Sequence, residues 1–200
     1  MHVLSVDIAA RKGRMNCGLA LIDPSKLVEL GEPADDLVWT RTIDATELAT
    51  ISRTLAGVRA ELGAPFLLAL ERQFSARVSP DPTAVEKLMR TRIQFETVAE
   101  IRGIACELVY PATWRTILNV LGDEVPMKIS KPRKPPQPKG KRGAPPPAPE
   151  PEKLGRNVRD FQAGARLLAE RLYPEIELTK DQCDALLLAR HVGWQRRAGS

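Results

Sequence analysis

The chain has 200 residues, 43% of them hydrophobic, which is enough for the core of one domain and argues against two. Its formal net charge of +5 is uneven, because the segment from Lys128 to Arg142 holds seven cationic residues and no acidic one. Three scattered cysteines argue against a disulfide framework and a zinc site, and no secretory leader or bilayer-length apolar run is visible. We therefore expect a cytoplasmic protein with no membrane partner.

Hydrophobic periodicity predicts an alternation of strands and helices. Runs of β-forming residues predict strands at 3–7, 15–22, 37–43, 66–70 and 106–109. Apolar residues spaced three and four apart predict helices at 44–62, 83–106, 112–121, 153–172 and 179–194. We expect the first three strands to be antiparallel and the fully apolar run at 66–70 to be a central parallel strand.

Several local signals refine these boundaries. The first two strands should form a hairpin whose loop is longer than a two-residue turn. Asp44 is a suitable N-cap for the first helix, and Gly63 lies just past its end. Thr179 and Gln182 have the spacing of a capping box at the start of the last helix.

A proline-rich stretch interrupts the chain. Ten of the 17 prolines lie between Pro126 and Pro151, among Lys, Arg, Gly and Ala and with almost no large apolar side chain. Such a segment cannot bury enough surface to offset the entropy cost of ordering it, so we expect 126–152 to be a disordered insert. The single folded domain would then consist of 1–125 and 153–200.

Four carboxylates are the strongest functional signal. Asp7 and Glu71 each end an apolar strand, where a charged side chain costs desolvation unless something binds it. Asp181 and Asp184 are three residues apart near the start of a helix, so they share one face, and the helix dipole favours anions there. In one fold the four would form a site for hard divalent cations.

Each acid taken singly has a simpler interpretation. Asp7 could be a strand-end turn residue, Glu71 a partner in a surface salt bridge, and the helical pair an ordinary capped helix start. The combination and order of the four favour a metal site.

The sequence resembles the crossover junction endonucleases, the RuvC-like Holliday junction resolvases of the ribonuclease H-like superfamily. The resemblance covers most of the chain outside the insert, and its motifs lie at 3–7, 18–20, 69–74, 100–103, 111–115 and 181–186. It implies an α/β fold with a ribonuclease H-like mixed five-stranded sheet flanked by helices, in which the first three strands are antiparallel and the others parallel.

The same resemblance implies a catalytic role. Asp7, Glu71, Asp181 and Asp184 would bind two Mg²⁺ or Mn²⁺ ions and cleave branched DNA by two-metal phosphodiester hydrolysis, leaving 5′-phosphate and 3′-hydroxyl ends. It also implies a homodimer that pairs through the helix at about 83–103, although the apolar residues there could equally pack on the chain's own sheet.

DNA contacts are expected around the acids and in the insert. Phe74 matches an aromatic that stacks on a base in the family, and a Phe packed under its loop is the other interpretation. Cations expected to contact phosphates are Arg11, Lys12, Arg14, Arg72, Arg77, Arg115, Lys131, Arg133 and Lys134, with solvated surface charge as the alternative for any one of them. For Tyr110 and Trp114 we expect core packing.

Other function classes remain open from the sequence. A ribonuclease H-like nuclease for RNA–DNA hybrids or replication forks would carry the same fold and acids. A non-catalytic DNA-binding scaffold is disfavoured because all four acids are present. An actin-like phosphotransferase ranks last, because no glycine-rich phosphate loop is visible.

Overall fold

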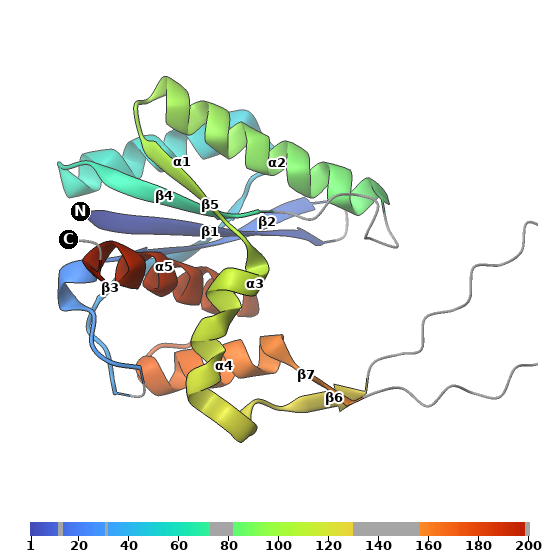
Figure 1. Ribbon diagram of the computed structural model, residues 1–200. Coiled ribbons are helices and arrows are strands. Elements are labelled where there is room, and N and C mark those ends of the chain that lie inside the picture. Colours follow the sequence, from blue (N-terminus) through green and yellow to red (C-terminus); the bar gives the residue numbers. More distant parts are fainter. Residues whose placement is uncertain (12–13, 31, 73–81, 130–156, 199–200) are drawn as a thin grey trace, which may run out of the picture.

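The computed structural model describes residues 1–11, 14–30, 32–72, 82–129 and 157–198. Its centre is a five-stranded sheet in the order β3-β2-β1-β4-β5 (Figure 1). The strands are β1 (His2–Arg11), β2 (Arg14–Ile22), β3 (Leu37–Asp44), β4 (Phe66–Glu71) and β5 (Ala105–Val109). The first three pair antiparallel, while β4 pairs parallel with both β1 and β5. The predicted mixed five-stranded sheet is confirmed.

Helices cover both faces of this sheet. On one face lie α1 (Leu48–Leu62) and α2 (Pro82–Ile101), and on the other lies α5 (Lys180–Ala198) (Figure 1). A further layer packs outside α5 and consists of α3 (Pro111–Trp114), the 3-10 helix η2 (Arg115–Glu124) and α4 (Phe161–Leu172). No helix in the described ranges is long and apolar enough to cross a bilayer.

The sheet separates two hydrophobic cores, and β4 contributes to both. Every residue of β4 is buried, with Leu67 and Ala69 in the core under α5 and Leu68 and Leu70 in the core under α1 and α2. A strand buried on both faces has a continuous run of apolar residues, and this is why β4 could be predicted correctly from the sequence.

The last helix begins as predicted. The Thr179 backbone N–H donates to the Gln182 side chain at 2.8 Å, and the Gln182 N–H donates to the Thr179 hydroxyl at 3.4 Å, which completes the capping box. Its middle is buried on all sides because α5 lies between the sheet and α4.

Two predictions about the first half of the chain are wrong. Arg11 pairs with Arg14, so the hairpin connection has only two residues, 12–13, and these lie outside the described residues. Asp44 does not cap α1, because pairing with β2 extends β3 through Asp44. Its carboxylate instead accepts a hydrogen bond from the Thr46 N–H at 3.0 Å, in a turn before the helix.

Boundaries in the second half also differ from prediction. The second helix ends at Ile101 rather than 106, because Gly103 has a positive φ of 62° that reverses the chain before β5. The helix expected over 112–121 is a single α-turn followed by η2, and it runs on to Glu124.

A short hairpin stands at the base of the proline-rich stretch. Strand β6 (Met127–Ile129) pairs antiparallel with β7 (Asn157–Arg159), so part of the insert expected to be disordered forms a strand. The helix predicted from 153 begins only at Phe161, because Asp160 caps it by accepting from the N–H groups of Gln162 and Ala163. Residues 130–152 lie outside the described residues.

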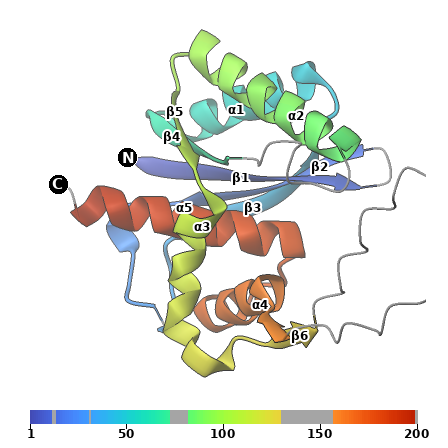
Figure 2. The same ribbon diagram turned by 45° about the vertical axis from the view of Figure 1, so that its right-hand side comes forward.

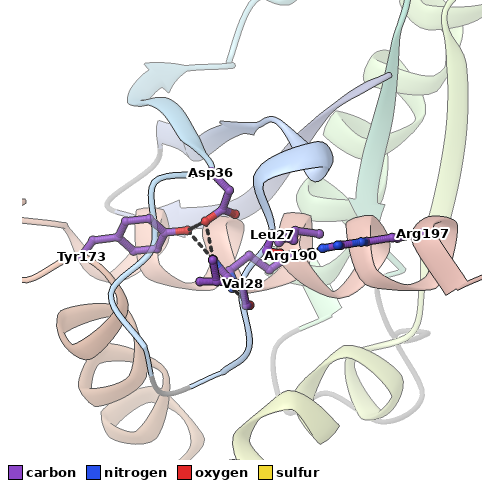
Figure 3. Close-up of polar contacts among 6 residues, drawn as sticks. All are labelled: Leu27, Val28, Asp36, Tyr173, Arg190 and Arg197. Carbon is purple, nitrogen blue, oxygen red and sulfur yellow. Dashed lines mark hydrogen bonds and ion pairs between the residues drawn. The ribbon is translucent and has the colours of Figure 1, made fainter.

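A buried ion pair fastens the connection between β2 and β3 to α5 (Figure 3). The Arg190 guanidinium pairs with the Asp36 carboxylate, and both side chains are fully buried. Arg190 also donates to the Tyr173 hydroxyl at 2.9 Å and to the Val28 carbonyl at 2.8 Å. Nearer the helix end, Arg197 donates to the Leu27 carbonyl at 2.6 Å. These bonds fix α5 along the sheet from its C-terminal half.

Candidate active site

Asp7 lies in the central strand of the sheet. Strand β1 is hydrogen-bonded to β2 on one side and β4 on the other, and Asp7 pairs with Gly18 in the β2 ladder. Side chains alternate along a strand, so Asp7 shares a face with Val3 and Ser5, and Val3 belongs to the core under α5. The carboxylate therefore emerges between the sheet and the last helix.

Two contacts hold the start of α5 against this part of the sheet. A Cβ added at Gly18 would fall inside contact distance of the Asp181 carbonyl and 2.7 Å from the Gln182 nitrogen, so the helix backbone rests on the glycine. One turn further on, the buried Ser5 hydroxyl donates to the Ala185 carbonyl. Together these contacts bring the first turn of α5, with Asp181 and Asp184, to the face that carries Asp7.

Glu71 enters from the neighbouring strand. It is the last residue of β4 and is buried, with one carboxylate oxygen 3.5 Å from a guanidinium nitrogen of Arg115. The N–H of the buried Trp114 indole lies close enough to Glu71 to lower the pKa of that carboxyl. The two groups nevertheless do not form a hydrogen bond, and Trp114 Nε1 has no other hydrogen-bond partner. Residues 111–115 thus form one wall of the site.

Burial and mutual repulsion raise the pKa values of three of these acids. The pKa of Asp7 is well above its usual value, first because of burial and then because of the charges of Asp184, Glu71 and Asp181. Burial raises the pKa of Asp184 to about 6 against the opposing effect of Arg115 and Lys180, and it raises that of Glu71 against Arg115. Such repulsion is relieved when a cation binds between the carboxylates.

The donor set fits hard divalent cations. Carboxylate oxygens are the ligands that Mg²⁺ and Mn²⁺ prefer, and these four side chains influence one another electrostatically. Within the described ranges, however, no three Asp, Glu, His or Cys side chains are close enough to hold an ion as they stand. Ion binding would therefore have to draw the carboxylates inward.

The same wall offers donors for an anion. The Trp114 Nε1 and Arg115 Nε atoms are buried and have no hydrogen-bond partner. Buried N–H groups without a partner are costly, so they mark places where a ligand acceptor is missing. Carboxylates and unsatisfied N–H donors side by side suit a phosphate held together with metal ions.

The structure brings the four predicted acids and Arg115 into one neighbourhood. The other described cations lie apart from the acids. Arg72 is exposed and stacks over Tyr110, and Arg14 lines a surface pocket with Asp44 and Thr46. The side chain of Arg11 is not described, and Lys12, Phe74, Arg77, Lys131, Arg133 and Lys134 lie outside the described residues.

Sequence reasoning missed some of the neighbours. Lys180, whose charge opposes the raised pKa values of Asp7 and Asp184, was not singled out, although it directly precedes Asp181. Trp114 is buried as predicted, yet it also reaches the site. Core packing is wrong for Tyr110, whose side chain is 50% exposed. Tyr110 comes directly after the last residue of the edge strand β5, where fewer elements can cover it. No periodicity signal separates these two aromatics.

Comparison with known proteins gives matches in structure only. No family model matches the sequence, and no curated protein matches it significantly. Thermus thermophilus RuvC in complex with a Holliday junction substrate is 13% identical, with a TM-score of 0.59 over 100% of this chain and 96% of that chain. A second structure of T. thermophilus RuvC is 14% identical, with a TM-score of 0.57 over 100% of this chain and 97% of that chain.

The yeast mitochondrial Holliday junction resolvase Ydc2 is 14% identical, with a TM-score of 0.45 over 98% of this chain and 81% of that chain. At the identities of the two RuvC structures, the similarity establishes the fold. The chain has the ribonuclease H-like fold of the RuvC Holliday junction resolvases.

Proposed function

We propose that this protein is a divalent-metal-dependent endonuclease that cleaves four-way or branched DNA and leaves 5′-phosphate and 3′-hydroxyl ends. The observation that supports it most is the meeting of Asp7, Glu71, Asp181 and Asp184 from β1, β4 and α5, in a fold shared with resolvases. The nuclease domain would be formed by 1–125 and 153–200, together with strand β6.

The four acids would hold two Mg²⁺ or Mn²⁺ ions, with Asp7 in the central position because the other three all act on its charge. When bound, the ions supply an activated water and stabilise the leaving 3′-oxygen. Arg115 would hold a phosphate oxygen through its free Nε while its terminal nitrogen stays near Glu71. The Trp114 N–H would donate to the same phosphate group.

Other parts of the chain would bind DNA without taking part in the reaction. Arg72 and Arg14 lie in the described surface and would contact phosphates. Arg11 at the end of β1, and Lys12 and Arg77 in the segments that follow β1 and β4, would also contact phosphates, whereas Phe74 would stack on a base. Lys131, Arg133 and Lys134 would act within a basic tether that raises the local DNA concentration and whose effect is lost at high salt.

A homodimer would place two such sites on a symmetric junction. Helix α2 packs one stripe on the sheet with Phe95 and Val98, and it leaves Ile93 and Ile101 exposed by 49% and 78%. These two residues, eight apart, lie on the outer side of the helix. We infer that they form the centre of a twofold interface.

The test compares cleavage of synthetic four-way junctions, linear duplex, flaps and RNA–DNA hybrid with Mg²⁺ and with EDTA. Wild-type protein should nick junctions in symmetric pairs only with metal, and Asp7→Asn should lower the rate by at least about a hundredfold. The exposed Asp123→Asn is the matched control and should cut normally. Preferred cutting of the hybrid, or binding without any cleavage, would refute the proposal.

Metal binding can be followed without activity. Mn²⁺ or Mg²⁺ should raise the melting temperature of wild-type protein, since a ligand that binds only the folded state stabilises it. Asp7→Asn should lose this shift, whereas Asp123→Asn should keep it.

A further inference from the structure

Two aromatic rings are exposed among the described residues, Tyr110 by 50% and Phe161 by 42%. The other described aromatic side chains are buried or half-buried, namely Trp39, Phe66, Phe95, Trp114, Tyr173 and Trp194. Large aromatic rings usually contribute to a core, so two exposed ones require an explanation.

Each ring lies against an arginine, and one of these arginines, Arg115, belongs to the candidate site. The Arg72 guanidinium is 4.6 Å from the centre of the Tyr110 ring, and Arg72 directly follows Glu71. The Arg115 guanidinium is 5.8 Å from the centre of the Phe161 ring and 3.5 Å from the Glu71 carboxylate. Phe161 is therefore linked to Glu71 through Arg115, and Tyr110 lies against the residue that follows Glu71 in the chain.

The two rings belong to elements that are connected through α3 and η2. Tyr110 joins β5 to α3, and Phe161 is the first residue of α4. In Figures 1 and 2, α3 leads from the end of β5 toward the layer that contains α4. The backbone N–H of Arg72 donates to the Val109 carbonyl at 2.7 Å, which fixes the end of β4 beside the root of Tyr110.

Two basic residues, Lys128 and Arg159, lie close to Phe161 in the chain or the fold. Lys128, half exposed, pairs with Asp160 at 3.0 Å in the hairpin just before α4, and Arg159 is exposed beside it. An aromatic face for a base, with guanidinium and ammonium groups for the phosphates, is the combination used to bind unpaired strands. A duplex offers no free base face, so these rings suit nucleotides that have left the helix.

We propose that Tyr110 and Phe161 are stacking platforms for unpaired nucleotides next to the cleaved bond, with Arg72 and Arg115 holding the rings and the adjoining phosphates. This inference rests on the proposed nuclease function and adds its mode of substrate selection. Two such platforms would favour a junction, where strands exchange and bases unpair, over a continuous duplex.

The test measures binding of a four-way junction with 2-aminopurine at the nucleotides flanking the crossover, in Ca²⁺ to prevent cleavage. Tyr110→Ala and Phe161→Ala should each weaken binding roughly 5- to 150-fold and restore the fluorescence that stacking quenches. Tyr110→Phe and Phe161→Trp should behave as wild type, because they keep an aromatic face.

Matched controls separate stacking from apolar contact and from misfolding. Val38→Ala, at a site 44% exposed on the far edge strand β3, should change neither signal. Phe161→Leu keeps an apolar side chain without a ring, so binding as tight as wild type in this variant would overturn the stacking role. Each alanine variant should melt within a few degrees of wild type, since the lost side chain is exposed.

The outcomes distinguish this inference from the proposed function. If wild-type protein binds and cuts junctions while both alanine variants match it in affinity and fluorescence, the stacking role is wrong and the nuclease function stands. If wild-type protein binds no branched DNA, both are wrong.

Discussion

Gly18 in β2 lies directly beneath the Asp181 carbonyl at the start of α5, too close for any side chain to fit between them. The ladder partner of Gly18 is Asp7, so this close approach of helix to sheet is also the approach of two predicted metal ligands. A missing Cβ in a strand thus sets the geometry of the site.

Gly18→Ala should damage the site more than the fold. The added methyl meets helix backbone that cannot rotate away, so α5 must shift, at a cost of about 1–3 kcal/mol in the free energy of unfolding. A shift of about 1 Å at the site can lower the cleavage rate about a hundredfold. Urea unfolding and single-turnover cleavage measure the two effects.

The control for this substitution is Gly57→Ala in α1, where nothing lies within 4 Å of the added Cβ. It should stabilise the protein by about 0.5–1 kcal/mol and leave cleavage unchanged. Normal cleavage by Gly18→Ala would show that α5 need not rest on β2.

The raised pKa of Asp184 predicts how metal-free stability depends on pH. Burial moves this pKa from the ordinary 3.8 to about 6, so the folded protein binds the proton more tightly than the unfolded chain does. The stabilisation is complete below about pH 4 and is lost as the pH rises through 6, by an amount on the order of 2 kcal/mol. Denaturant unfolding in EDTA from pH 4 to 8 measures it.

Asp184→Asn isolates this effect, because an amide does not titrate. The difference in unfolding free energy between wild type and variant should change across pH 4 to 6 and be flat above about 7. A difference that does not vary with pH would show that Asp184 titrates alike in the folded and unfolded states.

Removing one partner of the buried ion pair should destabilise the protein strongly. Arg190→Met leaves the fully buried Asp36 without its counter-charge, which should lower the free energy of unfolding by about 3–5 kcal/mol. Adding Asp36→Asn to this variant removes the stranded charge and should recover part of the loss. Urea unfolding of the single and double variants tests this. A double variant no more stable than Arg190→Met would contradict it.

The outer side of α2 should decide the oligomeric state. The double substitution Ile93→Asp and Ile101→Asp places charges in the proposed interface. The dissociation constant of the dimer should therefore rise more than about tenfold. Sedimentation velocity across a concentration series measures it. The control Val120→Asp, at another exposed site, should have no effect. A wild-type protein that stays monomeric at high concentration would contradict the proposed dimer.

Strong local patterns allowed much of the fold to be predicted from sequence. The apolar run 66–70 is typical of a strand buried on both faces, and Thr179 with Gln182 forms the expected capping box. Asp7 and Glu71 stood out because each follows an apolar run, where a charge has no use in a core. Glu71 does end β4, but β1 continues past Asp7 to Arg11, so the strand end expected at Asp7 is wrong. These features depend on residues close together in the chain, where sequence spacing and spatial spacing agree.

The remaining features depend on contacts between distant segments. Pairing with β2 drew Asp44 into a strand, and pairing with β6 did the same for Asn157–Arg159, against the helical pattern in each case. Whether an aromatic side chain is buried like Trp114 or exposed like Tyr110 depends on which elements cover it, and the sequence carries no mark of this. The sequence by itself determined which acids are present and which elements carry them. Only the tertiary structure decided that α5 rests on Gly18, because that contact joins residues more than 160 positions apart.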